Sequence, residues 1–207
     1  MTMRVATWNV NSIAARLPHV TAWLAEHEPD VICLQEIKTE TARFPAAAFA
    51  ELGYTAAVHG QRTYNGVAIL AKGADPVLTR DALPGDPGDD QTRYIEAAVN
   101  GVLVASIYVP NGNPQPGPKF DYKLAWFDRL ISHAATLCPL DAPVVLAGDF
   151  NVVPTDRDIY PPLMVEGRAA PAGKPSSHPA AAGAGLDRCD SGRSPGSADA
   201  HILGLPT

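Results

Sequence analysis

The chain has 207 residues, of which 22 are acidic and 16 basic, and its formal net charge is -6 at pH 7. This balance argues against binding of nucleic acid through bulk positive charge, although it is compatible with an enzyme that has a local basic cleft. The sequence shows no apolar run as long as a membrane span, no signal peptide and only three scattered cysteines, so we expect a cytoplasmic protein with reduced thiols and no membrane partner.

The composition divides the chain after Tyr160. All aromatic residues lie in 1–160, whereas 161–207 contains none and consists largely of Ala, Pro, Gly and Ser. Such a segment buries too little apolar surface to offset its chain entropy. We therefore expect one globular unit over 1–160, followed by a disordered, low-complexity tail over 161–207.

Short apolar segments predict the strands of the globular unit. In chain order they cover 4–9, 30–35, 54–58, 66–71, 94–99, 102–108 and 144–147. The segments 94–99 and 102–108 flank Asn100-Gly101, which is the strongest short signal for a hairpin. The sequence thus predicts at least one antiparallel pair of strands.

Apolar residues at helical spacing predict three helices between these strands. The first opens at Pro18, a residue that suits a first helical position, and the second covers 46–52 and ends at Gly53. The third has its inner face at Phe120, Leu124, Phe127, Ile131 and Ala134. Because hairpins alternate with strand–helix units, we expect a layered α/β fold with a mixed sheet.

Polar side chains follow four of the predicted strands at the point where each strand ends. They are Asn9 and Asn11 after the first strand, Glu36 after the second, Tyr108 and Asn111 after the hairpin, and Asp149 and Asn151 after the last. Carboxylate and amide oxygens on separate strand ends can converge on one rim of a sheet, where they suit Mg²⁺ or Mn²⁺. A divalent ion beside such groups is a common device for phosphoryl transfer to water.

Each of these residues taken alone also fits a structural role. Glu36 is then a surface charge, Asn9 a turn former, Tyr108 a half-buried packing residue and Asp149 a cap. The hypothesis of a functional site therefore depends on the four strand ends together, in this order and spacing.

Six motifs stand out within 1–160. They are Trp8-Asn9-Val10-Asn11-Ser12-Ile13, Leu34-Gln35-Glu36-Ile37-Lys38-Thr39, Asn65-Gly66-Val67-Ala68-Ile69, Arg93-Tyr94-Ile95-Glu96, Tyr108-Val109-Pro110-Asn111-Gly112 and Gly148-Asp149-Phe150-Asn151-Val152-Val153-Pro154. Together they resemble the exodeoxyribonuclease III branch of the endonuclease/exonuclease/phosphatase family. The run Ile37-Lys38-Thr39 and the run that begins at Tyr108 are specific to this DNA-repair branch, which includes the abasic-site endonucleases.

The resemblance implies a four-layer α/β sandwich and a Mg²⁺-dependent phosphodiesterase, and the oxygen donors suit Mn²⁺ as the alternative ion. Its substrate would be double-stranded DNA with 3′ ends or abasic sites, and it would act as a monomer. Carried over position by position, the implied metal ligands are Glu36, Asn9, Asp149 and Asn151. The resemblance further implies that Tyr108 contacts the scissile phosphate, that Asp149 orients or deprotonates the attacking water, that Asn151 binds the phosphate, and that Arg93 and Asn111 contact DNA.

The resemblance stops near Tyr160. The family continues with a Trp-Asp-Tyr segment and an Asp-His pair that this chain lacks, and we interpret His178 and His201 as solvated histidines. A frameshift between about 160 and 165 would explain the change, because 201–206 can be encoded by codons that give Ile-Phe-Trp-Asp-Tyr when read one base later. We therefore expect a truncated nuclease with impaired activity.

Two alternatives remain open. Besides the nuclease, the chain could be a non-catalytic remnant that binds Mg²⁺ or DNA weakly. It could also be another phosphodiesterase of the superfamily that acts on a lipid or inositol phosphate. The two branch-specific runs argue against the second alternative.

Overall fold

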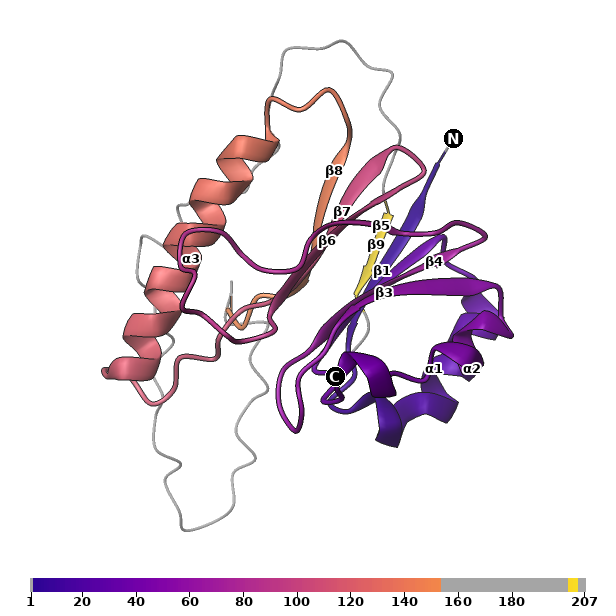
Figure 1. Ribbon diagram of the computed structural model, residues 1–207, viewed down its shortest axis with the longest axis horizontal. Helices are drawn as coiled ribbons and strands as arrows, with labels where there is room; N and C mark the ends of the chain where they lie inside the picture. The colour runs from indigo at the N-terminus through magenta and orange to yellow at the C-terminus, as the bar shows by residue number, and fades with distance from the viewer. Residues whose placement is uncertain (1, 154–200, 205–207) are drawn as a thin grey trace, which may run out of the picture.

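The computed structural model describes residues 2–153 and 201–204. Four layers lie one on another in Figure 1: two helices, a five-stranded sheet, a four-stranded sheet and a long helix. The prediction of a layered, four-layer α/β sandwich is confirmed.

The five-stranded sheet has the order β3-β4-β2-β1-β9. Its members are β3 (Tyr54–His59), β4 (Val67–Lys72), β2 (Val31–Gln35), β1 (Arg4–Asn9) and β9 (His201–Gly204). Strands β1 and β2 run parallel with Asn9 paired to Gln35, so the polar residues that follow both strands emerge at the same end of the sheet. Strand β2 is buried along its whole length, as its continuous apolar run predicts.

Strand β9 lies in the segment expected to be disordered. It pairs in parallel with β1, from Arg4 opposite His201 to Thr7 opposite Gly204. The edge of β1 offers backbone N–H and C=O groups with which this short strand can pair. The rest of the expected tail, and the expected boundary at Tyr160, lie outside the described residues.

The four-stranded sheet has the order β5-β6-β7-β8. Its members are β5 (Val77–Arg80), β6 (Tyr94–Val99), β7 (Val102–Tyr108) and β8 (Val144–Asp149). The hairpin β6–β7 has the predicted bounds, and β7 pairs in parallel with β8 so that Tyr108 lies opposite Asp149. Strand β5 was not predicted, because all four of its residues are exposed and give no apolar pattern.

Helix α1 (Ile13–His27) starts earlier than predicted. Ser12 caps it through its side chain, which accepts a hydrogen bond from the Ala15 N–H, and Pro18 lies inside the helix. The prediction that the helix opens at Pro18 is therefore wrong, because a serine cap defines the start before the proline is reached. A short 3₁₀ turn, η1 (Thr41–Arg43), and helix α2 (Ala46–Ala50) complete this layer, with α2 ending before the predicted Leu52.

Helix α3 (Pro118–Leu137) covers the outer face of the four-stranded sheet (Figure 1). Its buried residues are Lys123, Trp126, Leu130, His133 and Leu137, whereas Ile131 is exposed. The predicted inner face is therefore wrong at Ile131, whereas Phe127 is partly buried and packs against the cluster between the sheet and α3. The apolar spacing misleads because the helix buries two polar side chains, Lys123 and His133, that have hydrogen-bond partners in the sheet and its loops.

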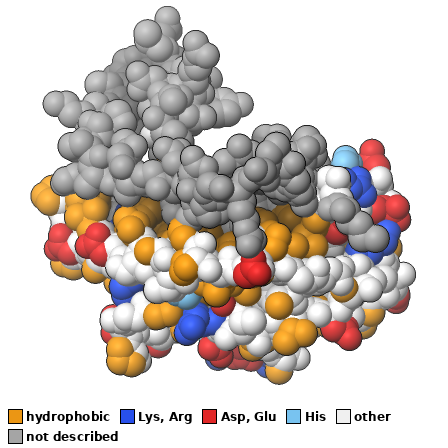
Figure 2. Space-filling model, turned by 90° about the horizontal axis from the view of Figure 1, so that it is seen from above, with side chains coloured by type: hydrophobic (Ala, Val, Ile, Leu, Met, Phe, Trp, Pro, Cys, Tyr) orange, Lys and Arg blue, Asp and Glu red, His pale blue; other side chains and the backbone are white. Residues whose placement is uncertain are grey.

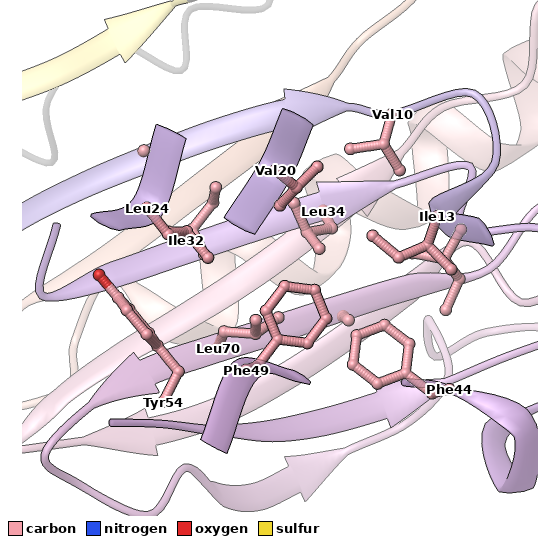
Figure 3. Close-up of a cluster of buried hydrophobic side chains, with 13 residues drawn as sticks. Val10, Ile13, Val20, Leu24, Ile32, Leu34, Phe44, Phe49, Tyr54 and Leu70 are labelled. Carbon is pink, nitrogen blue, oxygen red and sulfur yellow. The ribbon is translucent and has the colours of Figure 1, made fainter. Parts of the chain in front are cut away.

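Three apolar clusters separate the layers. One lies between α1, α2 and the five-stranded sheet, where Phe44 and Phe49 stack with ring centroids 5.4 Å apart and Tyr54 donates a hydrogen bond to the Pro29 carbonyl at 2.7 Å (Figure 3). A second fills the space between the sheets, and a third lies between the four-stranded sheet and α3. The two sheets are thus packed face to face, and this packing fixes the positions of their strand ends relative to each other.

The described residues include one cysteine that is a free thiol. Cys33 is fully buried between the two sheets, and burial raises its pKa to about 12. This agrees with the expectation of a reduced thiol at that position.

The margins of the four-stranded sheet expose apolar side chains. Val77 and Leu78 on β5 are exposed, and β8 is only partly buried along most of its length. Figure 2, which views the molecule from above, shows apolar side chains gathered in a band beside the residues drawn in grey. None of the helices in the described residues is both long and apolar enough to cross a membrane.

Candidate active site

The ends of four strands bring carboxylate, amide and phenol groups together between the two sheets. The Asn9 side-chain N–H₂ donates to Glu36 Oε1 at 2.7 Å and to Asp149 Oδ2 at 2.8 Å. The Tyr108 hydroxyl donates to the same Glu36 Oε1 at 2.9 Å. We call Asn9, Glu36, Tyr108, Asp149 and Asn151 the carboxylate rim. Each of these residues was predicted, and each lies at or just after the end of β1, β2, β7 or β8.

The backbone around Glu36 is held in an unusual conformation. Glu36 and Lys38 both have a positive φ of 51°. The Ser12 N–H donates to the Glu36 carbonyl at 2.7 Å, and the Lys38 N–H donates to the Asn65 carbonyl at 3.0 Å. A left-handed conformation is costly for residues with long side chains, so these flanking hydrogen bonds maintain it. Such strain is common at functional sites.

Glu36 is a half-buried carboxylate with several donors. Lys38 Nζ lies 2.9 Å from Glu36 Oε2. Burial raises the pKa of Glu36, but the hydrogen bonds from Asn9, Lys38 and Tyr108 and the charge of Lys38 together outweigh burial, so the pKa lies below its usual value. Glu36 is therefore ionised at neutral pH and available to a cation.

Tyr108 is held between Glu36 and Arg93. The Arg93 guanidinium lies over the phenol ring, 4.6 Å from its centroid, and donates to the Tyr108 carbonyl at 3.4 Å. Burial raises the pKa of Tyr108 to about 12, with a further contribution from Glu36 that exceeds the opposing effect of Arg93. The phenol is thus a neutral hydrogen-bond donor, and Arg93 supports it from one side.

Asp149 is fixed by its neighbours in sequence and in space. Gly148 has a φ of 157°, and a Cβ at this position would lie 1.9 Å from the Ile107 carbonyl oxygen, so only glycine fits here. The Asn151 N–H donates to Asp149 Oδ1 at 2.9 Å, and the Asn151 side-chain N–H₂ donates to the Val109 carbonyl at 2.8 Å. Both oxygens of Asp149 therefore have a donor, one from Asn9 and one from Asn151.

Lys123 is a site residue that the sequence did not reveal. Its ammonium donates to the Asn151 carbonyl at 2.6 Å and to the Asn111 carbonyl at 3.3 Å, and the residue is 8% exposed. Burial lowers the pKa of Lys123, and the charge of Asp149 opposes that shift. Lys123 thereby joins the two loops that follow β7 and β8. A lysine on a predicted helix is ordinarily a surface residue, so no local signal marks it.

Asn111 and Gly112 complete the contact with Lys123. The Asn111 side chain is exposed and accepts a hydrogen bond from the Asn113 N–H at 3.1 Å. Gly112 has a φ of 80°, and a Cβ here would lie 2.6 Å from Lys123 Cδ. The glycine therefore gives the lysine side chain room to reach both carbonyls.

The donor set of the carboxylate rim fits a magnesium-type ion. Among the described residues, no three or more His, Cys, Asp or Glu side chains come together as a metal cage. Mg²⁺ does not need such a cage, because it keeps several waters and binds one or two carboxylates together with substrate phosphate. Glu36 and Asp149 can supply those carboxylates. Asn9 can add its amide oxygen only by turning its side chain, because its N–H₂ now donates to both carboxylates and its oxygen accepts the Asn11 N–H at 3.1 Å.

The described residues also form a cavity away from the rim. A cavity of about 350 Å³ lies beside α3, where Arg129, Ser132 and His133 form part of its lining. None of the rim residues lines that cavity.

Comparisons with known proteins identify the family of the chain. The model of the endonuclease/exonuclease/phosphatase family matches residues 6–200. Exodeoxyribonuclease III of Haemophilus influenzae is 34% identical over 162 residues, which is 76% of this chain and 60% of that protein. The chain thus spans less than two thirds of the length of this relative.

Two solved structures share the fold. The 3′ phosphatase NExo from Neisseria, solved with a product DNA hairpin, has 42% sequence identity and a TM-score of 0.71, with 76% of this chain and 61% of that chain covered. An AP endonuclease from Archaeoglobus fulgidus has 38% identity and a TM-score of 0.70, with the same coverage of 76% and 61%. The family match over most of the chain, together with these relatives, establishes that the chain belongs to the endonuclease/exonuclease/phosphatase family.

Proposed function

We propose that this chain is a metal-dependent DNA phosphodiesterase of the exodeoxyribonuclease III type, acting at 3′ ends of double-stranded DNA and beside abasic sites. The main support for the proposal is that the Asn9 side-chain N–H₂ donates to both Glu36 and Asp149, while the Tyr108 hydroxyl donates to the same Glu36 oxygen. Two carboxylates and a neutral donor therefore lie together on one rim.

Glu36 and Asp149 would hold Mg²⁺, with Asn9 and Asn151 as further oxygen ligands. When bound, the ion supplies positive charge that stabilises the phosphate oxygens as they become more negative. Glu36 suits this task because its pKa lies below the usual value and it carries a full charge at neutral pH.

Asp149 is the residue placed to orient the attacking water. Its two oxygens are held by Asn9 and by the Asn151 N–H, so the carboxylate cannot turn freely. Tyr108 stays protonated at neutral pH and can donate a hydrogen bond to the scissile phosphate. A fixed base and a fixed donor lower the barrier because they need little reorganisation during the reaction.

A polyanionic substrate is supported by the cations around the rim. Lys38, Arg93 and Lys123 lie beside the carboxylates although the whole chain has a net charge of -6. Tyr64, which is 68% exposed, lies in the loop whose Asn65 carbonyl accepts the Lys38 N–H. An exposed aromatic ring beside cations suits a nucleic acid, and the relatives act on DNA by name.

We further propose that this activity is impaired. Among the described residues, the hydrogen bonds of the rim include no histidine, whereas the resemblance calls for an Asp-His pair at the phosphate. Loss of one preorganised contact to developing charge costs about 10²–10³ in rate. Turnover at or below the detection limit of a steady-state assay is therefore expected.

The test is a single-turnover assay with the full chain in excess over a 5′-labelled duplex that carries a recessed 3′ end or an abasic site. Slow cleavage in Mg²⁺, none in EDTA, and none by the Asp149→Asn variant would support the proposal. The exposed Asp75, which follows β4 at the end away from the rim, provides the matched control Asp75→Asn.

Each other outcome is informative. Fast steady-state turnover would refute the proposed impairment. No cleavage even in single turnover would refute a catalytic role and favour a non-catalytic chain that binds metal or DNA. Hydrolysis of an inositol phosphate or phospholipid, without cleavage of DNA, would assign the chain to another phosphodiesterase class.

A further inference from the structure

Lys38 occupies the one oxygen of Glu36 that the rim leaves open. Glu36 Oε1 accepts hydrogen bonds from Asn9 and Tyr108, whereas Lys38 Nζ lies 2.9 Å from Oε2. Among the described residues, Lys38 is the donor that contacts Oε2, whereas both other donors contact Oε1. A cation that binds this carboxylate therefore meets an ammonium already in place.

The backbone holds Lys38 in this position. Glu36 and Lys38 share a φ of 51°, and the intervening Ile37 is fully buried. The Ile37 N–H donates to the Gly66 carbonyl at 3.2 Å, and a Cβ at Gly66 would lie 2.5 Å from Ile37 Cγ1. Two left-handed residues on either side of a buried anchor thus keep the carboxylate and the ammonium on the same rim.

Lys38 also has a second acceptor. Its ammonium donates a short hydrogen bond to Asn11 Oδ1, and Asn11 is itself exposed. The Lys38 side chain is 28% exposed and the Glu36 side chain 19% exposed. The lysine can therefore leave the carboxylate without being left unsolvated, because it keeps the Asn11 oxygen and contacts water.

We propose that Lys38 is an exchangeable counter-cation, an inference that rests on the proposed function. Its ammonium neutralises Glu36 in the metal-free protein, and a divalent ion that binds Glu36 displaces the ammonium toward Asn11. The displaced ammonium remains at the rim beside the position of an anionic substrate. Lys38 is thus a positioning residue that keeps the carboxylate paired until the metal arrives.

This role predicts that removing the Lys38 ammonium has opposite effects on the stability of the metal-free protein and on its affinity for a divalent ion. Removing the ammonium leaves Glu36 without a cation, so the metal-free protein becomes less stable. The same change removes a competitor and a repulsive charge, so the protein binds a divalent ion more tightly. Because a ligand that binds the folded state stabilises it, the stability difference between the variant and the wild type shrinks as the metal concentration rises. A lysine that only supports the local structure would weaken both properties.

The experiment measures Mn²⁺ binding to the full chain by electron paramagnetic resonance of the free ion, for the wild type, Lys38→Met and Lys38→Gln. Lys72→Met is the matched control, because the Lys72 side chain is 32% exposed, close to the 28% of Lys38, and pairs with Glu28 away from the rim. We expect about fivefold tighter Mn²⁺ binding in both Lys38 variants, as for the loss of a partly exposed ion pair, and no change in the control.

Thermal melts of the same proteins, with and without Mn²⁺, provide the second readout. The Lys38 variants should melt below the wild type in EDTA and approach it at saturating Mn²⁺. Unchanged or weaker Mn²⁺ binding in both variants, in proteins that still melt cooperatively, would overturn the inference. If Glu36→Gln leaves Mn²⁺ binding intact, the metal site of the proposed function is itself wrong, which is a separate result.

Discussion

Replacing Gly148 by alanine tests how tightly the strand before Asp149 is packed. Strands β7 and β8 pair Ile107 directly with Gly148. A Cβ at Gly148 would lie 1.9 Å from the Ile107 carbonyl oxygen and 2.7 Å from its carbonyl carbon. Since carbon and oxygen atoms approach to about 3.3 Å in the closest ordinary contacts between strands, the end of β8 must move by roughly 1.4 Å.

Such a movement carries Asp149 with it. We expect Gly148→Ala to lower the free energy of unfolding in urea by about 3 kcal/mol, from overpacking together with the cost of a positive φ. Single-turnover cleavage should fall by about 10², the typical cost of a 1 Å misplacement. These two measurements separate the loss of stability from the loss of alignment.

Gly101→Ala is the matched control for this substitution. Gly101 has a φ of 82°, but a Cβ there would have no atom within 4 Å. The control therefore carries the cost of the backbone conformation alone, about 1–2 kcal/mol. Equal destabilisation by the two substitutions, with cleavage unchanged in both, would refute the argument that close packing at β7 positions Asp149.

Three further predictions concern buried polar groups. Lys123→Met leaves two loop carbonyls without their charged donor and should lower the free energy of unfolding in urea by about 2 kcal/mol, whereas the exposed Lys119→Met should change it by less than about 0.5 kcal/mol. Equal effects would contradict the role of the buried ammonium. Burial raises the pKa of Glu96, but the hydrogen bonds from His133 and two hydroxyl groups outweigh burial and hold it below the usual 4.5. The stabilisation is therefore complete above about pH 4.5 and is lost as the pH falls through the lower pKa of the folded state. The urea midpoint of the wild type should then fall more steeply with acid than that of Glu96→Gln. An equally steep fall in both proteins would count against this prediction. Tyr54→Phe removes the hydroxyl that donates to a buried backbone carbonyl and should cost about 1 kcal/mol in the same assay, with no loss of DNA cleavage.

Most of the fold and of the rim could be predicted because local patterns and tertiary structure agree there. The continuous apolar run of β2 favours a buried strand, and the Asn100-Gly101 turn favours an antiparallel hairpin. The polar residues after the strands could be placed on one rim because β1 pairs in parallel with β2, and β7 with β8. Their chemical roles stay predictions.

What could not be predicted depends on contacts between distant residues. Lys123 is buried because its ammonium donates to the carbonyls of two loops, at Asn111 and Asn151. No residue near Lys123 in the sequence predicts that these loops lie beside it. His133 is buried because it bonds to Glu96 across the sheet–helix interface at 3.0 Å. The exposed edge strand β5 and the partner-dependent β9 have too little apolar pattern to be recognised before their neighbours are known.

Anomalous diffraction from crystals of the full chain soaked in Mn²⁺ would locate the metal directly. A metal site at the strand ends predicts a single strong peak at the carboxylate rim, within metal–oxygen bonding distance of Glu36, on the side now occupied by the Lys38 ammonium. It also predicts that the peak disappears in Glu36→Gln crystals and persists in those of Glu28→Gln, whose carboxylate pairs with Lys72 away from the rim. A peak elsewhere, or a rim peak that survives in Glu36→Gln, would contradict the central claim that these strand ends form a metal-dependent phosphodiesterase site.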